Sequence, residues 1–133
     1  MSLIEQFIQR ARQTPRRVVL PEGDDPQIVQ AACRLADEGI AQPILLGGQT
    51  QIEAVAGSRT LSGVRVVDPS TGGLLGRFAA AYSQRREGVT EQVALRLVRR
   101  PLMFGAMMVA EGEADAMVAG ITRPTAQVIS AAS

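Results

Sequence analysis

The chain has 133 residues, which is the length of one ordinary domain and enough to bury a real core. Hydrophobic residues make up 46% of it and charged residues 20%, a balance that excludes intrinsic disorder. The formal net charge is only +1 and aromatic residues reach 3%. Nucleic-acid-binding proteins usually carry a clear basic excess, so we expect no nucleic-acid partner.

Several residue types are missing, and each absence removes a class of chemistry. All 14 cations are arginine, so no lysine can form a Schiff base. The absence of histidine excludes Ser–His and Cys–His catalysis and histidine metal ligands from this chain. Its one cysteine, Cys33, excludes an intrachain disulfide and a thiolate cluster, and we expect it to be a small core residue. We expect no metal site.

The amino-terminal residues carry charges and lack the apolar region of a secretory signal. The longest apolar stretches are far shorter than a membrane span. We therefore expect a cytoplasmic protein that does not interact with a membrane.

The first predicted elements form a strand followed by a well-delimited helix. Residues 3–12 have apolar side chains at helical spacing and predict a short amphipathic helix. The apolar run 17–20 predicts a buried strand. The next helix should be capped by Asp25, begin at Pro26 and stop at Gly39. The side chains expected on its inner face are Ile28, Ala31, Ala32, Leu35 and Ala36.

A second unit of the same kind follows. Residues 43–46 predict a strand, 49–56 a short helix and 64–67 a third strand. Alternating strands and helices are typical of parallel βαβ units. The sequence therefore predicts an α/β fold with three layers, α/β/α, and a mainly parallel sheet.

The second half of the chain is mostly helical. Three helices are predicted first: one at 74–86, one that starts after a cap at Val89 or Thr90, and one at 102–111. A strand at 116–119 follows, and a last helix starts at Thr122 or Thr125. The helix at 102–111 is apolar all round, so we expect it to be buried on every side or to lie in an interface. The chain ends without a helix stop, so we expect it to be part of a larger fold.

The loop at 120–125 is the first candidate functional site. A glycine is followed there by Thr122, Arg123 and Thr125 at the predicted start of a helix. Helix N-termini attract anions, and an arginine adds a charged fork. The alternative is an ordinary turn in which a threonine caps the helix.

Two other charged groups have simpler alternatives. Arg85 and Arg86 end a predicted helix and could bind an anion. The simpler alternative is a solvated surface, because the helix dipole favours cations at a helix C-terminus in any case. The acidic loop at 22–25 could bind a metal, but the sequence favours a loop and helix cap because no other ligand type is nearby.

Ordered blocks of residues cover nearly the whole chain and together resemble one family. These blocks are 17–25 (RVVLPEGDD), 31–32 (AA), 38–41 (EGIA), 43–47 (PILLG), 66–69 (VVDP), 82–90, 104–109 (FGAMMV) and 112–120 (GEADAMVAG). On these residues the chain resembles the phosphate acetyltransferases (phosphotransacetylases) and the related phosphate butyryltransferases. The resemblance covers only the amino-terminal part of that family's fold, with residues 1–133 forming most of one domain.

The resemblance implies a two-domain enzyme of the isocitrate and isopropylmalate dehydrogenase fold, often a homodimer. The family moves an acyl group reversibly between coenzyme A (CoA) and inorganic phosphate, with acetyl phosphate or another acyl phosphate as the partner substrate. CoA is a substrate there, and no separate cofactor is implied. The family's catalytic residues and most of its CoA site lie beyond this chain, so the catalytic residues are unknown and the chain is expected to be inactive alone.

The resemblance also implies phosphate-binding residues. The family's first phosphate arginine matches Arg85, with Arg86 as the alternative, and its hydroxyl-bearing loop matches Thr122 and Thr125. Ser130 stands where the family has a second arginine, and Arg123 is the candidate substitute. That departure leaves open a non-catalytic regulatory or assembly domain that binds an acyl-CoA or acyl phosphate. A third alternative is an interaction fragment without a ligand.

Overall fold

In the computed structural model, the residues described are 13, 16–58 and 60–119. They form one sheet of four parallel strands in the order β3-β2-β1-β4. The strands are β1 (Arg16–Leu20), β2 (Ala41–Leu46), β3 (Arg65–Val67) and β4 (Ala116–Met117). The parallel α/β architecture expected from the sequence is confirmed. The helix predicted at 3–12 lies outside the described residues.

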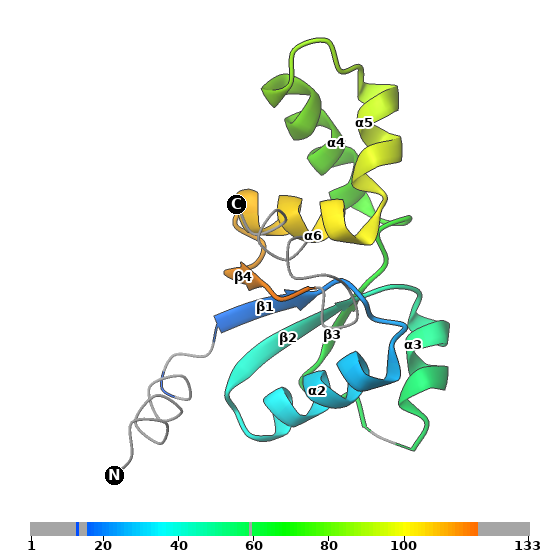
Figure 1. The fold of residues 1–133 in the computed structure, drawn as a ribbon, viewed down its shortest axis with the longest axis vertical. Helices are drawn as coiled ribbons and strands as arrows, with labels where there is room; N and C mark the ends of the chain where they lie inside the picture. Colours follow the sequence, from blue (N-terminus) through cyan, green and yellow to red (C-terminus); the bar gives the residue numbers. More distant parts are fainter. Residues whose placement is uncertain (1–12, 14–15, 59, 120–133) are drawn as a thin grey trace.

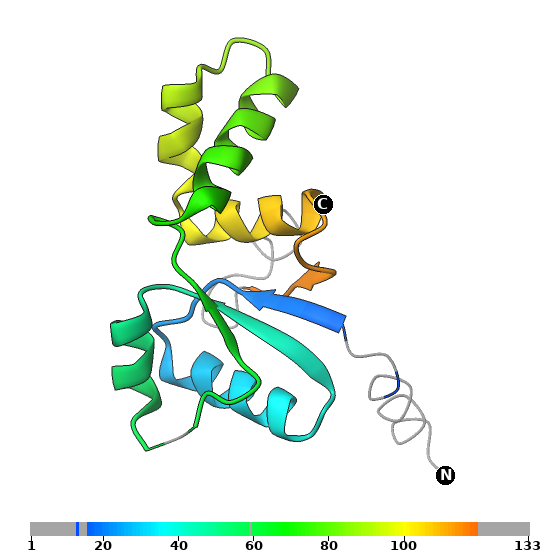
Figure 2. The same ribbon diagram turned by 180° about the vertical axis from the view of Figure 1, so that it is seen from behind.

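Helices cover both faces of the sheet. They are α2 (Pro26–Asp37), α3 (Gln49–Ala56), α4 (Gly73–Arg85), α5 (Glu91–Val98) and α6 (Pro101–Ala110). Figure 1 shows α2 and α3 on one face and α6 on the other, with the α4–α5 hairpin standing on α6 away from the sheet. The view from behind shows the same layers (Figure 2).

The strand order places a topological switch point beside β1. Val19 of β1 pairs with Ile44 of β2 on one side and with Met117 of β4 on the other. The chain therefore moves outward from β1 through β2 to β3, and then returns to the opposite side of β1. In open α/β sheets, ligands bind beyond the carboxyl ends of the strands at such a point.

The face covered by α2 and α3 has its own apolar core. Leu20 and Leu45 from the sheet pack with Ile28 and Val29 of α2 and with Ile52 of α3. The inner face of α2 differs from the prediction, since its buried residues are Ile28, Val29, Ala32 and Cys33, whereas Ala31, Leu35 and Ala36 are half-buried. The apolar stripe of α2 is broad enough that either of two sides of the helix could face the sheet. In the structure the side that carries Val29 packs against the sheet.

The opposite face has the larger core, and α6 lies in the middle of it. Phe104 and Met108 of α6 are fully buried, and Phe104 meets Phe78 of α4 edge to face with ring centroids 5.1 Å apart. The sheet lies on one side of α6 and the α4–α5 hairpin on the other. This double contact explains the apolar character of α6 on its two packed sides. Burial on every side is not found, since four of its ten residues are buried and Pro101 and Ala110 are exposed.

Local capping signals set the ends of α2. The Asp25 carboxylate accepts hydrogen bonds from the backbone N–H of Gln27 at 2.8 Å and of Ile28 at 3.4 Å. At the other end Gly39 has φ +67°, and its N–H donates to the Ala36 carbonyl. Both predicted boundaries are confirmed, because a side-chain cap and a left-handed glycine act within a few residues of the chain.

Several predicted boundaries are corrected by the structure. The strand predicted at 43–46 begins two residues earlier, at Ala41, and the helix predicted at 102–111 runs from Pro101 to Ala110. The helix predicted at 74–86 runs from Gly73 to Arg85, so Arg86 is its extended C-cap residue. The strand predicted at 116–119 pairs with β1 only over Ala116–Met117. Among the described residues, no helix has the length and apolar character needed to cross a bilayer.

Candidate functional site at the carboxyl edge of the sheet

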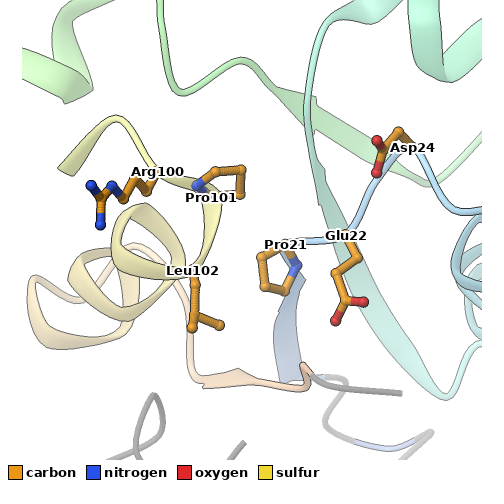
Figure 3. A pocket seen from close by; sticks show the side chains of 6 residues that line it. All are labelled: Pro21, Glu22, Asp24, Arg100, Pro101 and Leu102. Carbon is orange, nitrogen blue, oxygen red and sulfur yellow. The ribbon is translucent and has the colours of Figure 1, made fainter. Parts of the chain in front are cut away.

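A cavity of about 330 Å³ lies at the carboxyl end of β1, next to the switch point. Its lining residues are Pro21, Glu22, Asp24, Arg100, Pro101 and Leu102. In Figure 3 the side chains of Pro21, Pro101 and Leu102 stand between the two charged groups. The carboxylates belong to the β1 side, and Arg100 belongs to the α6 side with its guanidinium pointing outward. The cavity thus has an apolar centre and charged margins, as small-molecule sites commonly do.

The start of α6 forms one wall of this cavity. Pro101 is the first helical residue, and the N-cap residue Arg100 makes no side-chain capping bond. The first-turn N–H groups of the helix therefore receive no side-chain cap, and the helix dipole adds partial positive charge there. The Arg100 guanidinium points away from the cavity, and the carboxylates of Glu22 and Asp24 line the opposite wall, so the positive charge inside the cavity comes from the start of α6.

The loop after β1 forms the other wall, and Gly23 lets it lie close to β2. A Cβ on Gly23 would come within 2.3 Å of the Leu46 carbonyl oxygen. Any other residue would push the loop away from the strand. The acidic loop is therefore a tightly packed turn whose Asp25 caps α2, which confirms the loop-and-cap interpretation. Among the described residues, no group of three acidic or thiol ligands could hold a metal ion.

The structure places Arg85 and Arg86 on the α4–α5 hairpin, and neither lines the cavity beside β1. The Arg85 guanidinium donates to the Glu111 carboxylate at 2.7 Å. The Arg86 guanidinium lies over the Tyr82 ring, 5.7 Å from its centroid. Arg85 is therefore held by a carboxylate, whereas the Arg86 side chain makes an aromatic contact and no ion pair with the described residues.

The other predicted site residues fall outside the described part of the chain. They are Thr122, Arg123 and Thr125, together with Ser130 at the position of the family's second arginine. Their loop follows β4, which neighbours β1 across the switch point. The carboxyl end of β4 therefore lies at the same edge of the sheet as the cavity beside β1.

Ion pairs at the opposite edge hold β4 in register. Arg17 donates through its backbone N–H to Asp115 at 2.8 Å and through its guanidinium at 3.3 Å. These bonds lower the pKa of Asp115 below its usual range. Arg77 donates to Glu113 at 2.6 Å and lowers the pKa of that carboxyl in the same way. The turn before β4 is thereby tied to both β1 and α4.

Sequence reasoning missed Arg100 as a site residue. The available signal was Pro101, because proline favours the first position of a helix and would have marked Arg100 as the cap. That signal predicts where a helix starts in the sequence, but it does not predict where the helix start lies in the fold. Only the packing of α6 across the sheet brings Arg100 to the carboxyl end of β1.

Comparison with known proteins adds independent evidence. A family model described as phosphate acetyl/butaryl transferase matches residues 2–133. The phosphate acetyltransferase of Acetivibrio thermocellus is 37% identical over 131 residues, which cover 97% of this chain and 40% of that protein. The phosphate acetyltransferase of Escherichia coli (strain K12) is 35% identical over 129 residues, which cover 93% of this chain and 18% of that protein.

Solved structures agree with these sequence matches. A phosphotransacetylase from Streptococcus pyogenes superposes with a TM-score of 0.84 at 27% identity, covering 98% of this chain and 42% of that one. The EutD phosphotransacetylase from Staphylococcus aureus gives a TM-score of 0.81, also at 27% identity, over 97% of this chain and 43% of that one. The chain spans less than half the length of each of these relatives. With its sequence matched from residue 2 to residue 133 and its fold shared, the chain belongs to the phosphate acetyl/butaryl transferase family.

Proposed function

We propose that this chain supplies the phosphate-holding part of an enzyme that moves an acetyl group reversibly between CoA and inorganic phosphate. The observation that carries the proposal is the family match over residues 2–133. In the direction of acetyl-CoA synthesis, the CoA thiolate attacks the carbonyl carbon of acetyl phosphate. A carbon–sulfur bond forms, the carbon–oxygen bond to phosphate breaks, and phosphate leaves with its negative charge. Arginine side chains suit the task of holding that group.

Of the two arginines at the end of α4, we assign the phosphate to Arg86. Arg85 already donates one guanidinium N–H to Glu111 at 2.7 Å, so a phosphate bound there would share the guanidinium with a second negative charge. Arg86 makes no ion pair within the described residues, and its contact with Tyr82 leaves N–H groups free to turn toward an anion. Thr122, Arg123 and Thr125 are the proposed partners from the loop after β4.

The complete reaction requires more protein than this chain contains. The matched relatives named phosphate acetyltransferase are more than twice as long, since the chain spans 40% or less of each. We therefore propose that the chain alone binds phosphate without catalysing acetyl transfer. From the resemblance we further propose that the whole enzyme is a cytoplasmic homodimer.

The test combines a turnover assay with a binding measurement. The purified chain, given CoA and acetyl phosphate, should form no acetyl-CoA above a control without protein. Calorimetric titration with inorganic phosphate should show binding that Arg86→Ala and Arg123→Ala each weaken by about 1.5–3 kcal/mol, the range for a hydrogen bond to a charged group. Arg96→Ala is the matched control, because Arg96 is an exposed arginine on α5 without an ion pair in the described part of the chain.

Each result has a defined meaning. Equal phosphate affinity in the wild type, Arg86→Ala and Arg123→Ala would overturn the assignment of the phosphate site. Turnover by the 133-residue chain would overturn the proposal that it is inactive alone. Ser130, in place of a family arginine, favours one alternative: a non-catalytic domain that binds acyl phosphate or acyl-CoA. Binding of acetyl phosphate without turnover by the full-length gene product would support that alternative.

A further inference from the structure

A second cavity, of about 400 Å³, lies at the carboxyl ends of β2 and β3. The turn after β2, the loop after β3 and the junction between α5 and α6 line it. Pro101 lines both this cavity and the one beside β1, so the two are neighbours along the same edge of the sheet. Arg86, the one described residue assigned to phosphate above, does not line it.

Asp68 is held rigidly in the wall of this second cavity. Its Oδ1 atom accepts a hydrogen bond from the Ser70 hydroxyl at 2.6 Å and another from the Ser70 backbone N–H at 2.9 Å. These two bonds lower the pKa of Asp68, so the carboxylate remains ionised near neutral pH. Oδ2 lies 3.9 Å from the position that a Cβ on Gly48 would take, and so faces the turn after β2. It accepts no hydrogen bond from the described residues.

Arg99 belongs to another wall of the same cavity. It is the C-cap residue of α5 and is exposed. Among the described residues, no ion pair joins Arg99 to Asp68 or to another carboxylate. Two opposite charges therefore line one cavity without forming an ion pair with each other. The Gln51 side chain, which can donate and accept, lines it as well.

The charges define what the cavity can accept. A free inorganic anion would be attracted by Arg99 and repelled by Asp68. A metal cation would be attracted by Asp68 and repelled by Arg99. A carboxylate accepts hydroxyl donors, and a guanidinium donates to phosphate oxygens as a planar fork. A ligand with hydroxyls at one end and phosphate at the other would satisfy both. In nucleotide-binding α/β folds, a carboxylate close to a strand end binds ribose hydroxyls in this way.

We propose that this cavity binds a phosphorylated sugar, whose hydroxyls donate to Asp68 Oδ2 and whose phosphate accepts from Arg99. Its volume lies within the range of small-molecule sites. Two sources of this chemistry exist: a free sugar phosphate, or the 3′-phosphorylated ribose of CoA, in which the single free hydroxyl, the 2′-OH, would donate to Asp68. The identification of CoA as the ligand rests on the proposed function, whereas the proposal of a sugar phosphate site does not.

The test uses ribose 5-phosphate as the probe, titrated into the full 133-residue chain by calorimetry. In an Arg86→Ala background, which removes the proposed site for inorganic phosphate, ribose 5-phosphate should bind more tightly than ribose or inorganic phosphate does. Asp68→Asn and Arg99→Ala should each weaken its binding about ten- to hundredfold, as expected for loss of a charge-assisted hydrogen bond. Arg96→Ala, on the same helix and outside the cavity, should leave the affinity unchanged. Thermal unfolding checks that each variant remains folded.

A comparison of CoA with dephospho-CoA, which lacks the 3′-phosphate of the ribose, distinguishes the two sources. If CoA is the source, CoA binds more tightly than dephospho-CoA, and Arg99→Ala removes the difference. If the two bind equally while ribose 5-phosphate still depends on Asp68 and Arg99, the source is a free sugar phosphate. Equal ribose 5-phosphate affinity in the wild type and both variants would overturn the proposal, as would tighter binding of alanine, a zwitterion that also suits two opposite charges. Neither outcome bears on Arg86 or on acetyl transfer.

Discussion

Replacing Gly23 by alanine should destabilise the fold, because the new methyl group has no space. The ideal Cβ position lies 2.3 Å from the Leu46 carbonyl oxygen and 3.0 Å from its carbonyl carbon. Ordinary contacts begin at 3.4 Å, so the loop and strand β2 must separate by about 1.1 Å at this point. The obstructing atoms belong to the backbone, and no side-chain rotation can relieve the clash.

The magnitude follows from what has to move. Leu46 is 1% exposed and pairs with Val67 of β3, so its backbone cannot shift without disturbing the core. Overpacking a well-packed site costs about 1–3 kcal/mol, and a backbone clash belongs at the upper end of that range. We therefore expect Gly23→Ala to lower the free energy of unfolding by about 2–3 kcal/mol, a large part of the 5–15 kcal/mol typical of a domain.

Gly76→Ala is the matched control. Gly76 lies inside α4, is exposed, and has nothing within 4 Å of its ideal Cβ. Alanine there should raise the free energy of unfolding by about 0.5–1 kcal/mol through helix propensity. Urea unfolding followed by circular dichroism would measure both variants against the wild type. A Gly23→Ala protein within about 0.5 kcal/mol of the wild type would refute the close-packing argument.

Three further predictions concern the frame around the site. Asp25→Ala removes the cap of α2 and should cost about 1–2 kcal/mol in urea unfolding, while Asp25→Asn should retain most of the stability. Phe104→Ala leaves a cavity where two rings meet and should cost about 3–5 kcal/mol, so an unchanged melting temperature would contradict the packing described. Hydrogen bonds from Arg17 lower the pKa of Asp115, so their stabilisation is complete above the ordinary aspartate range near pH 4 and is lost as the pH falls through the lowered pKa. Asp115→Asn should therefore be less stable than the wild type near pH 7 and should converge with it toward about pH 2; an equal gap at both pH values would contradict this origin.

Local signals determined much of the fold from the sequence. The ends of α2 were predictable because Asp25 and Gly39 act on backbone groups only a few residues away. Helix α3 was predicted at 49–56 and is found over Gln49–Ala56, between two glycines. The parallel sheet followed from the alternation of strands and helices, which leaves little choice of architecture. The family resemblance was also readable in the sequence, because ordered blocks of residues carry it.

The tertiary structure decided what depends on distant parts of the chain. The side of α2 that faces the sheet, the short pairing of β4 and the burial of α6 between two layers all depend on non-local contacts. So does the difference between Arg85 and Arg86, since the partner of Arg85 is Glu111, 26 positions away. The neighbouring cavities at the carboxyl edge combine residues as far apart as Pro21 and Leu102. Hydrophobic periodicity indicates that an element has an apolar face, but it carries no information on which distant segments meet, because strand order and helix packing arise only when the whole sheet assembles.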